Sequence, residues 1–195
     1  WVFIGCSTTV YCEAPSQPNS WKSDWDEGIE SFVEWGVSPV VVDGLAYTVN
    51  QDTATLIRQP QMEVDKLTIP AIINHNNATY QVTAIGDSAF IGAAIGEITI
   101  SQGITQIGEM AFYYCHELTT VNIPGSVTTI KKQAFQSCGK LINVNLTQGL
   151  KTIGEEAFAN CSFLSTLKLT SRPTIMAARS FSFTSATFTV PIYLP

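Results

Sequence analysis

Hydrophobic positions recur along this chain with a period of about 23 residues. An Ala-Phe or Ser-Phe pair marks each unit, and the phenylalanines are Phe90, Phe112, Phe135, Phe158 and Phe181. Between the pairs runs a second pattern, apolar-x-x-apolar-x-apolar, whose alternation is typical of a half-buried strand. It occurs at 95–100, 118–123, 141–146 and 164–169, and 64–70 and 185–191 also fit it. The pattern therefore predicts six strand rungs.

A unit of this length cannot bury its own apolar face, whereas stacked units share one continuous core. We therefore predict an α/β solenoid, a right-handed coil with short parallel strands and a short helical turn at each Ala-Phe pair. Gly86, Gly108 and Gly154 precede that turn, where permissive backbone angles would be useful. Lys131 stands at the same position in another unit, so we expect that φ there is not strictly positive. The polar segment 74–80 is predicted to loop out between the first two rungs.

Three regions follow from this pattern. Residues 1–18 form an N-terminal segment, either a signal or lipoprotein remnant or disordered. Residues 19–63 form a cap that covers the first coil, as every solenoid requires. Residues 64–195 form the solenoid, and its apolar last residues indicate truncation or continuation into further sequence.

The cap is expected to contain a helix and a hairpin. Within 18–36, apolar residues recur at helical spacing and acidic residues line the other side, with Trp21, Trp25, Ile29 and Phe32 on the apolar face. This helix either covers the first coil, which we favour, or docks a partner through its tryptophans. The hairpin is expected at 44–58.

The stretch VTTIKKQAFQSCGKLINVNL at 127–146 resembles the BspA-type leucine-rich repeats of bacterial surface proteins. The resemblance covers about two-thirds of the chain, from about Leu67 onward. It implies a leucine-rich-repeat fold at the cell surface and a role in adhesion or protein binding. No catalytic residue is carried over, because the family motif has none.

Three cysteines, Cys115, Cys138 and Cys161, occupy one position of the repeat, where Ala93 and Thr184 stand in other units. Only small residues occupy this position in the different units, which indicates that the position faces the packed core. A metal site needs ligands that converge on one point, and parallel Cβ vectors suit a disulfide poorly. We therefore expect core packing and no metal.

Outside the repeat lie Cys6 and Cys12. The stretch WVFIGCS resembles the end of a lipoprotein signal, in which Cys6 would be lipidated. The alternatives are a disulfide between Cys6 and Cys12, which suits an oxidising compartment, or two free thiols.

The net charge of the chain and its few histidines exclude several classes of function. The formal net charge is −6 and no run of Lys or Arg exists, which argues against nucleic acid or anionic lipid as partner. No apolar window is long enough to span a membrane. Neither His75 nor His116 has a Ser/Asp or Cys/Asn pattern nearby that would indicate a catalytic site. We therefore expect no enzyme, no catalytic residue and no cofactor.

The candidate binding site is the outward face of the strands. On each rung the residues that flank the middle apolar position point outward, which selects Thr99, Thr120, Asn122, Asn143, Asn145, Thr166 and Lys168 as ligand-binding candidates. This face carries no aromatic ring on which a sugar could stack, so we favour a host or bacterial surface protein over a glycan. We expect a non-enzymatic extracellular or surface module, with outer-membrane lipid anchoring if Cys6 is modified. The alternatives are a structural spacer and an accessory domain of a larger surface protein.

Overall fold

The computed structural model of the 195-residue chain describes residues 10–12, 33–35, 39–57, 59, 62–168, 175–182, 184 and 187–189. Its strands are β1 (Val10–Cys12), β2 (Val33–Trp35), β3 (Val40–Val42), β4 (Leu45–Asn50), β5 (Thr53–Leu56), β6 (Glu63–Ile69), β7 (Ile72–His75), β8 (Ala78–Ile85), β9 (Ala94–Ile100), β10 (Gln106–Ile107), β11 (Thr120–Ile123), β12 (Thr129–Ile130), β13 (Asn143–Leu146), β14 (Thr152–Ile153), β15 (Thr166–Lys168), β16 (Ile175–Met176) and β17 (Thr187–Thr189).

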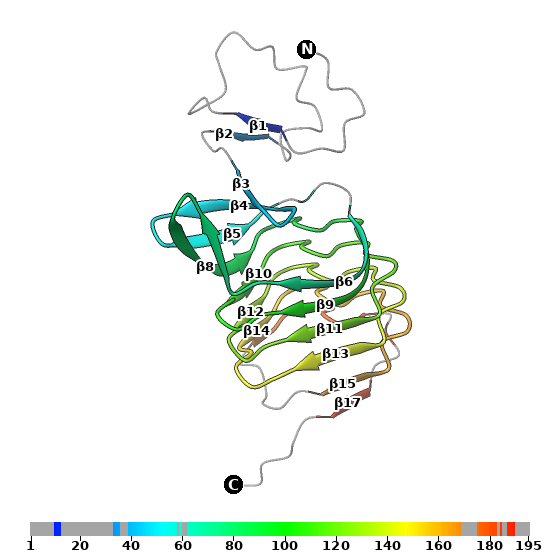
Figure 1. Cartoon of the computed structure of the whole chain (residues 1–195). Helices are drawn as coiled ribbons and strands as arrows, with labels where there is room; N and C mark the ends of the chain where they lie inside the picture. Colours follow the sequence, from blue (N-terminus) through cyan, green and yellow to red (C-terminus); the bar gives the residue numbers. More distant parts are fainter. Residues whose placement is uncertain are drawn as a thin grey trace, which may run out of the picture.

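The repeat forms two stacks of parallel strands that enclose one core (Figure 1). The first is a six-stranded sheet in the order β17-β15-β13-β11-β9-β6, and it contains all six predicted rungs. The second is built from the two-residue strands β10, β12, β14 and β16, continued by β8 and β5. Each coil of the chain therefore contributes one rung to each sheet, which confirms the predicted solenoid.

The register between rungs is the one that the sequence period requires. Val121 of β11 pairs with Ile98 of β9 on one side and with Val144 of β13 on the other. All three side chains are buried. A shift by one residue would turn these apolar side chains outward, so burial holds each rung in place.

Phenylalanine rings form a continuous column through the core. The centroids of Phe90, Phe112, Phe135, Phe158 and Phe181 follow one another at 5.2, 5.0, 5.1 and 5.2 Å, and successive ring planes are within 5–8° of parallel. The four rings from Phe90 to Phe158 are almost completely buried. Stacked rings of this kind contribute about 0.5–1.5 kcal/mol per pair beyond the burial of their area.

The predicted helical turn at Ala-Phe is wrong, because the structure places consecutive β-turns there. Met110 and Tyr114 have φ values of 52° and 60°, which no α-helix accommodates. The N–H groups alternate: that of Ala111 donates within the turn to Gly108, whereas that of Phe112 donates to the carbonyl of Ala134 in the next coil. A helix would use these donors internally, but here every second one joins two coils.

The glycines before the turn do not have a strictly positive φ, as the lysine at the equivalent position 131 led us to expect. None of Gly86, Gly108 and Gly154 has a positive φ. A Cβ on Gly108 would lie 2.5 Å from the carbonyl carbon of Gly86, and one on Gly154 would lie 2.5 Å from that of Lys131. These glycines allow the backbones of neighbouring coils to approach closely.

The cap region is described in part. The predicted hairpin at 44–58 is present as β4 and β5, which pair antiparallel, and β5 joins the second sheet beside β8. The predicted helix at 18–36 lies outside the described residues except at 33–35, where the chain forms strand β2, parallel to β1. At these three residues the helix prediction is wrong, because Val33 and Trp35 alternate with Glu34 as strand residues do.

The polar segment at 74–80 leaves the stack as predicted, but as the tip of a second hairpin. β7 and β8 pair antiparallel, and the two residues between them, Asn76 and Asn77, have φ values of 49° and 62°. Two successive left-handed residues are the signature of a type I′ turn, in which asparagine is favoured.

Candidate binding surface on the strand face

The register gathers the predicted binding residues into two columns on the six-stranded sheet. Thr99, Asn122, Asn145 and Lys168 are successive partners in one column, and Glu97, Thr120, Asn143 and Thr166 are successive partners in the other. Each column crosses four rungs, so residues far apart in sequence share one surface. We call the eight residues the polar strand face.

A directional chain of hydrogen bonds runs along the first column. The amide of Asn145 donates from Nδ2 to Oδ1 of Asn122 at 2.7 Å. Nδ2 of Asn122 donates in turn to Oγ1 of Thr99 and to Oε1 of Glu97, each at 3.2 Å. Because these hydrogen bonds fix the amides of Asn122 and Asn145, the first column presents these polar groups in a set orientation.

An ion pair ends this chain at the first rung. Nζ of Lys66 in β6 lies 3.0 Å from Oε2 of Glu97. The hydrogen bond from Lys66, together with its charge, lowers the pKa of the Glu97 carboxyl below its ordinary value. Sequence reasoning missed Lys66, although the alignment of 64–70 with the later rungs places it in the same column as Glu97.

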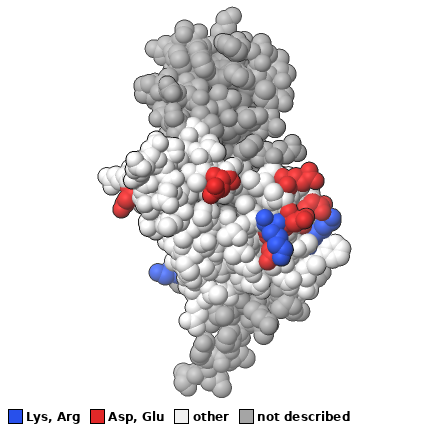
Figure 2. Space-filling model, viewed as in Figure 1, with Lys and Arg blue, Asp and Glu red and all other residues white. Residues whose placement is uncertain are grey.

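Exposure increases toward the middle of the stack. Asn143 and Asn145 are exposed, whereas Thr99, Thr120 and Asn122 are half-buried. For Thr166 and Lys168 the structure gives the strand register alone. In the view of Figure 2, charged side chains gather toward one side, and most of the remaining described surface is uncharged. The exposed centre of the face is therefore made of amide groups.

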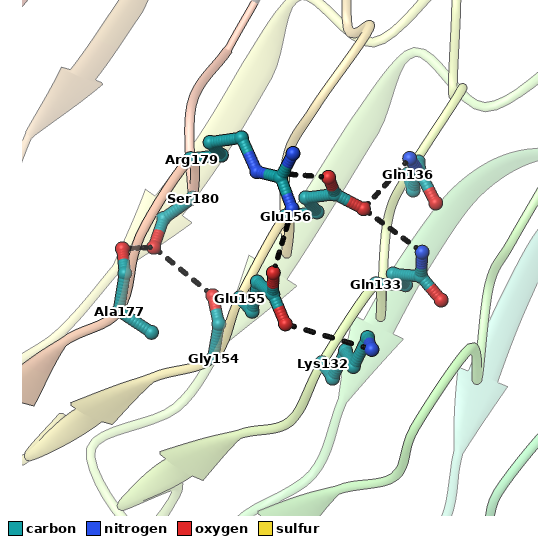
Figure 3. Close-up of polar contacts among 9 residues, drawn as sticks. All are labelled: Lys132, Gln133, Gln136, Gly154, Glu155, Glu156, Ala177, Arg179 and Ser180. Carbon is teal, nitrogen blue, oxygen red and sulfur yellow. Dashed lines mark hydrogen bonds and ion pairs between the residues drawn. The ribbon is translucent and has the colours of Figure 1, made fainter.

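A contrasting surface lies on the turn side of the coil (Figure 3). The guanidinium of Arg179 lies 2.8 Å from Glu155 and 3.2 Å from Glu156, and Lys132 lies 3.5 Å from Glu155. Oε2 of Glu156 also accepts hydrogen bonds from Gln133 and Gln136. The hydrogen bond from Arg179 is the main cause that lowers the pKa of Glu155. These charges compensate one another across three coils.

The cysteine column belongs to the core, as predicted. Cys115, Cys138 and Cys161 are completely buried and form no disulfide. Each thiol donates to a phenylalanine carbonyl oxygen in the preceding coil at 3.1 Å. Burial raises the pKa of the Cys138 thiol well above its ordinary value, which disfavours the thiolate form of that residue.

The remaining candidate residues do not converge. His75 lies beside Asn76 at the tip of the β7–β8 hairpin, and His116 packs against Tyr114. Cys6 lies outside the described residues, and Cys12 is placed only by its backbone in β1. In the described part of the chain, no three His, Cys, Asp or Glu side chains are grouped closely enough to hold a metal ion. Within the same residues, no helix is long and apolar enough to cross a membrane.

Parallel strands, short coils and a column of stacked phenylalanines define a leucine-rich-repeat solenoid. Residues 77–192 match six copies of the BspA type leucine-rich repeat region. The chain belongs to this family, as its resemblance to these repeats led us to expect. A comparison with curated proteins finds no match.

Solved structures of bacterial leucine-rich-repeat proteins have the same fold. The pneumococcal vaccine antigen PcpA is 20% identical with a TM-score of 0.62, and the match covers 78% of this chain and 50% of that one. A leucine-rich repeat protein from Bacteroides capillosus is 24% identical with a TM-score of 0.58, over 79% of this chain and 99% of that one. A leucine-rich cell surface protein from Faecalibacterium prausnitzii is 22% identical with a TM-score of 0.56, over 79% and 55%. The chain thus spans about half the length of two of these proteins.

Proposed function

We propose that this chain is a non-enzymatic binding module of a bacterial surface protein, and that it recognises a protein through the polar strand face. The oriented amide chain from Asn145 through Asn122 to Thr99 carries this proposal. Amides that are already fixed by their neighbours lose little conformational freedom when a partner binds. These amides present hydrogen-bond donors and acceptors in a row, to which the backbone or polar side chains of a protein partner could bind.

The similarity to bacterial surface proteins supports a location at the cell surface. The Faecalibacterium relative is described as a cell surface protein, and we propose the same setting for this chain, with adhesion as its role. A protein partner is favoured over a glycan because none of the eight residues of the polar strand face is aromatic. Cys6 is the proposed lipid-anchor site, and partition of the full-length protein into detergent, lost in Cys6→Ser, would test it.

The test of the binding site compares two triple variants of the full chain. Asn122→Ala/Asn143→Ala/Asn145→Ala removes the amides of the strand face, and Lys132→Ala/Gln133→Ala/Gln136→Ala removes polar groups of the turn side. Both are checked for folding by circular dichroism and then assayed by pull-down against extracellular-matrix proteins and mucin.

We expect the strand-face variant to lose at least tenfold in affinity, since each hydrogen bond is worth about 0.5–1.5 kcal/mol. The turn-side variant should bind as the wild type does. Equal binding by the wild type and the strand-face variant would contradict the proposed site. No binding by any form would favour the spacer, in which the repeats hold another domain away from the cell.

A further inference from the structure

Three aromatic rings meet on the surface just before β11. The ring centroids of Tyr113 and Tyr114 lie 4.7 Å apart with their planes tilted by 48°, and those of Tyr114 and His116 lie 4.8 Å apart at 84°. Tyr114 is 45% exposed and His116 is also exposed. Because the rings stand at large angles to one another, they form an open corner rather than a closed stack. We call these three residues the aromatic corner.

The backbone of Tyr114 is strained in a way that the fold does not require of an aromatic residue. Its φ is 60°, in the left-handed region. The equivalent residues in neighbouring coils have the same conformation, but they are Gly92, Ser137 and Asn160. Glycine and asparagine adopt this conformation readily, whereas a bulky side chain rarely does. Large residues such as Met110 and Gln133 also have a left-handed φ in these turns, so the conformation belongs to the repeat, and at position 114 it carries an exposed ring.

Open space borders the aromatic corner in both neighbouring coils. Gly92 is the equivalent of Tyr114 in the preceding coil, and Gly139 is the equivalent of His116 in the next one. A Cβ added to either glycine would meet no described atom within 4 Å. The coils on both sides therefore carry no side chain at these two positions that could cover the rings.

We propose that the aromatic corner binds an arginine or lysine side chain of a protein partner. A guanidinium or ammonium group is attracted to the face of a tyrosine ring. The chain carries a formal net charge of −6, of which residues 1–36 contribute −5, so this charge favours basic partners for the chain as a whole. The nearby cation, Lys140, is held 2.9 and 2.7 Å from the two carboxylate oxygens of Glu117, so its charge is compensated.

This surface lies outside the polar strand face, so it goes beyond the function proposed above and is tested separately. The probe is a hexa-arginine peptide, titrated into the full chain at physiological ionic strength, with a hexa-glutamate and a hexa-leucine peptide as comparisons. Tyr114→Asn removes the ring and supplies the residue that the equivalent position 160 already uses. Tyr114→Phe keeps a ring, and Phe163→Ser removes a different exposed ring, which is 66% exposed.

We expect Tyr114→Asn to weaken hexa-arginine binding by roughly threefold or more while its melting temperature stays equal or rises. Tyr114→Phe should bind within about twofold of wild type, since a phenyl face also attracts cations. Phe163→Ser should also bind within about twofold of wild type, because Phe163 is not part of the aromatic corner. In the wild type, the NMR signals of the rings of Tyr113, Tyr114 and His116 should shift on titration.

Three results would overturn the proposal. The first is that the NMR signals of the three rings stay unchanged when hexa-arginine is added to the wild type, a test that does not depend on the folding of any variant. The second is equal hexa-arginine binding by wild type and Tyr114→Asn, because overall charge would then explain the affinity. The third is hexa-leucine binding as tight as that of hexa-arginine, which would mark an apolar docking site instead.

Discussion

The thiol of Cys138 lies 3.1 Å from the carbonyl oxygen of Phe112, a residue of the preceding coil. The same relationship links Cys161 to Phe135 and Cys115 to Phe90. A cysteine at this position therefore fills the core and also donates a weak hydrogen bond between coils.

The three buried thiols should resist alkylation in the folded protein. Burial raises the pKa of the Cys138 thiol, and the thiolate is the reactive form. Iodoacetamide treatment followed by peptide mass mapping should leave Cys115, Cys138 and Cys161 unmodified in native conditions and modify all three in denaturant. Rapid native labelling at Cys138 would contradict the buried position.

Phe135→Ala should destabilise the protein by about 3–5 kcal/mol, because it leaves a cavity in the middle of the ring column. The ring of Phe135 stacks on both sides, at 5.0 Å from Phe112 and 5.1 Å from Phe158. Urea denaturation measures the change. Phe135→Leu retains most of the volume and should lose only about 1 kcal/mol; equal losses in the two variants would show that ring stacking and cavity size are not the cause.

Tyr47→Phe should raise stability and change its dependence on alkaline pH. The buried hydroxyl of Tyr47 has no hydrogen-bond partner among the described residues. Removing such an unpaired buried group raises the free energy of unfolding by about 1 kcal/mol. Burial, with a smaller effect of Asp43, raises the pKa of Tyr47 from 10.0 to about 12.

The sign of the alkaline effect follows from that shift. Because the folded state holds the phenol proton more tightly than the unfolded state, this contribution to stability is complete below pH 10.0 and is lost as the pH rises toward about 12. Thermal melts across this range should show a steeper decline for wild type than for Tyr47→Phe. Parallel declines would contradict the assignment to Tyr47.

Gly154→Ala should destabilise the stack by about 1–3 kcal/mol. The added Cβ would lie 2.5 Å from the backbone of Lys131 and Lys132, so the backbones of the two coils would have to shift apart. Gly139→Ala is the matched control, because its Cβ meets no described atom within 4 Å. The control should be neutral or gain about 0.4–1 kcal/mol, and calorimetry compares the two.

The sequence predicts the strand registers because each depends on residues that recur at one position. Burial of Ile98, Val121 and Val144 is encoded by their type and spacing alone. The turn at Ala-Phe was predicted incorrectly because its donors find partners about 23 residues away, as Phe112 does at Ala134. Helix propensity depends on residues that are close in sequence, so it does not take account of hydrogen-bond acceptors in the next coil.

The candidate site could be predicted only as a set of outward positions. Their alternation with buried residues identifies Asn122 and Asn145, but not the bond between their amides, which depends on side-chain rotamers. The aromatic corner was missed for a related reason. In sequence, Tyr113 and Tyr114 lie inside the turn motif, and only the backbone conformation shows that Tyr114 is strained.

The contacts that hold the coils together recur from coil to coil: phenylalanine ring on phenylalanine ring, cysteine thiol to phenylalanine carbonyl, and strand beside strand. A gene that encodes such a protein can therefore lose or duplicate a segment of one whole period, and each remaining coil still meets a neighbour of the kind it already fits. An insertion of any other length leaves every later residue facing the wrong partner unless it loops out, as 74–80 does at the tip of the β7–β8 hairpin. Recombination between repeats can thus alter how far the protein reaches without redesigning its interior.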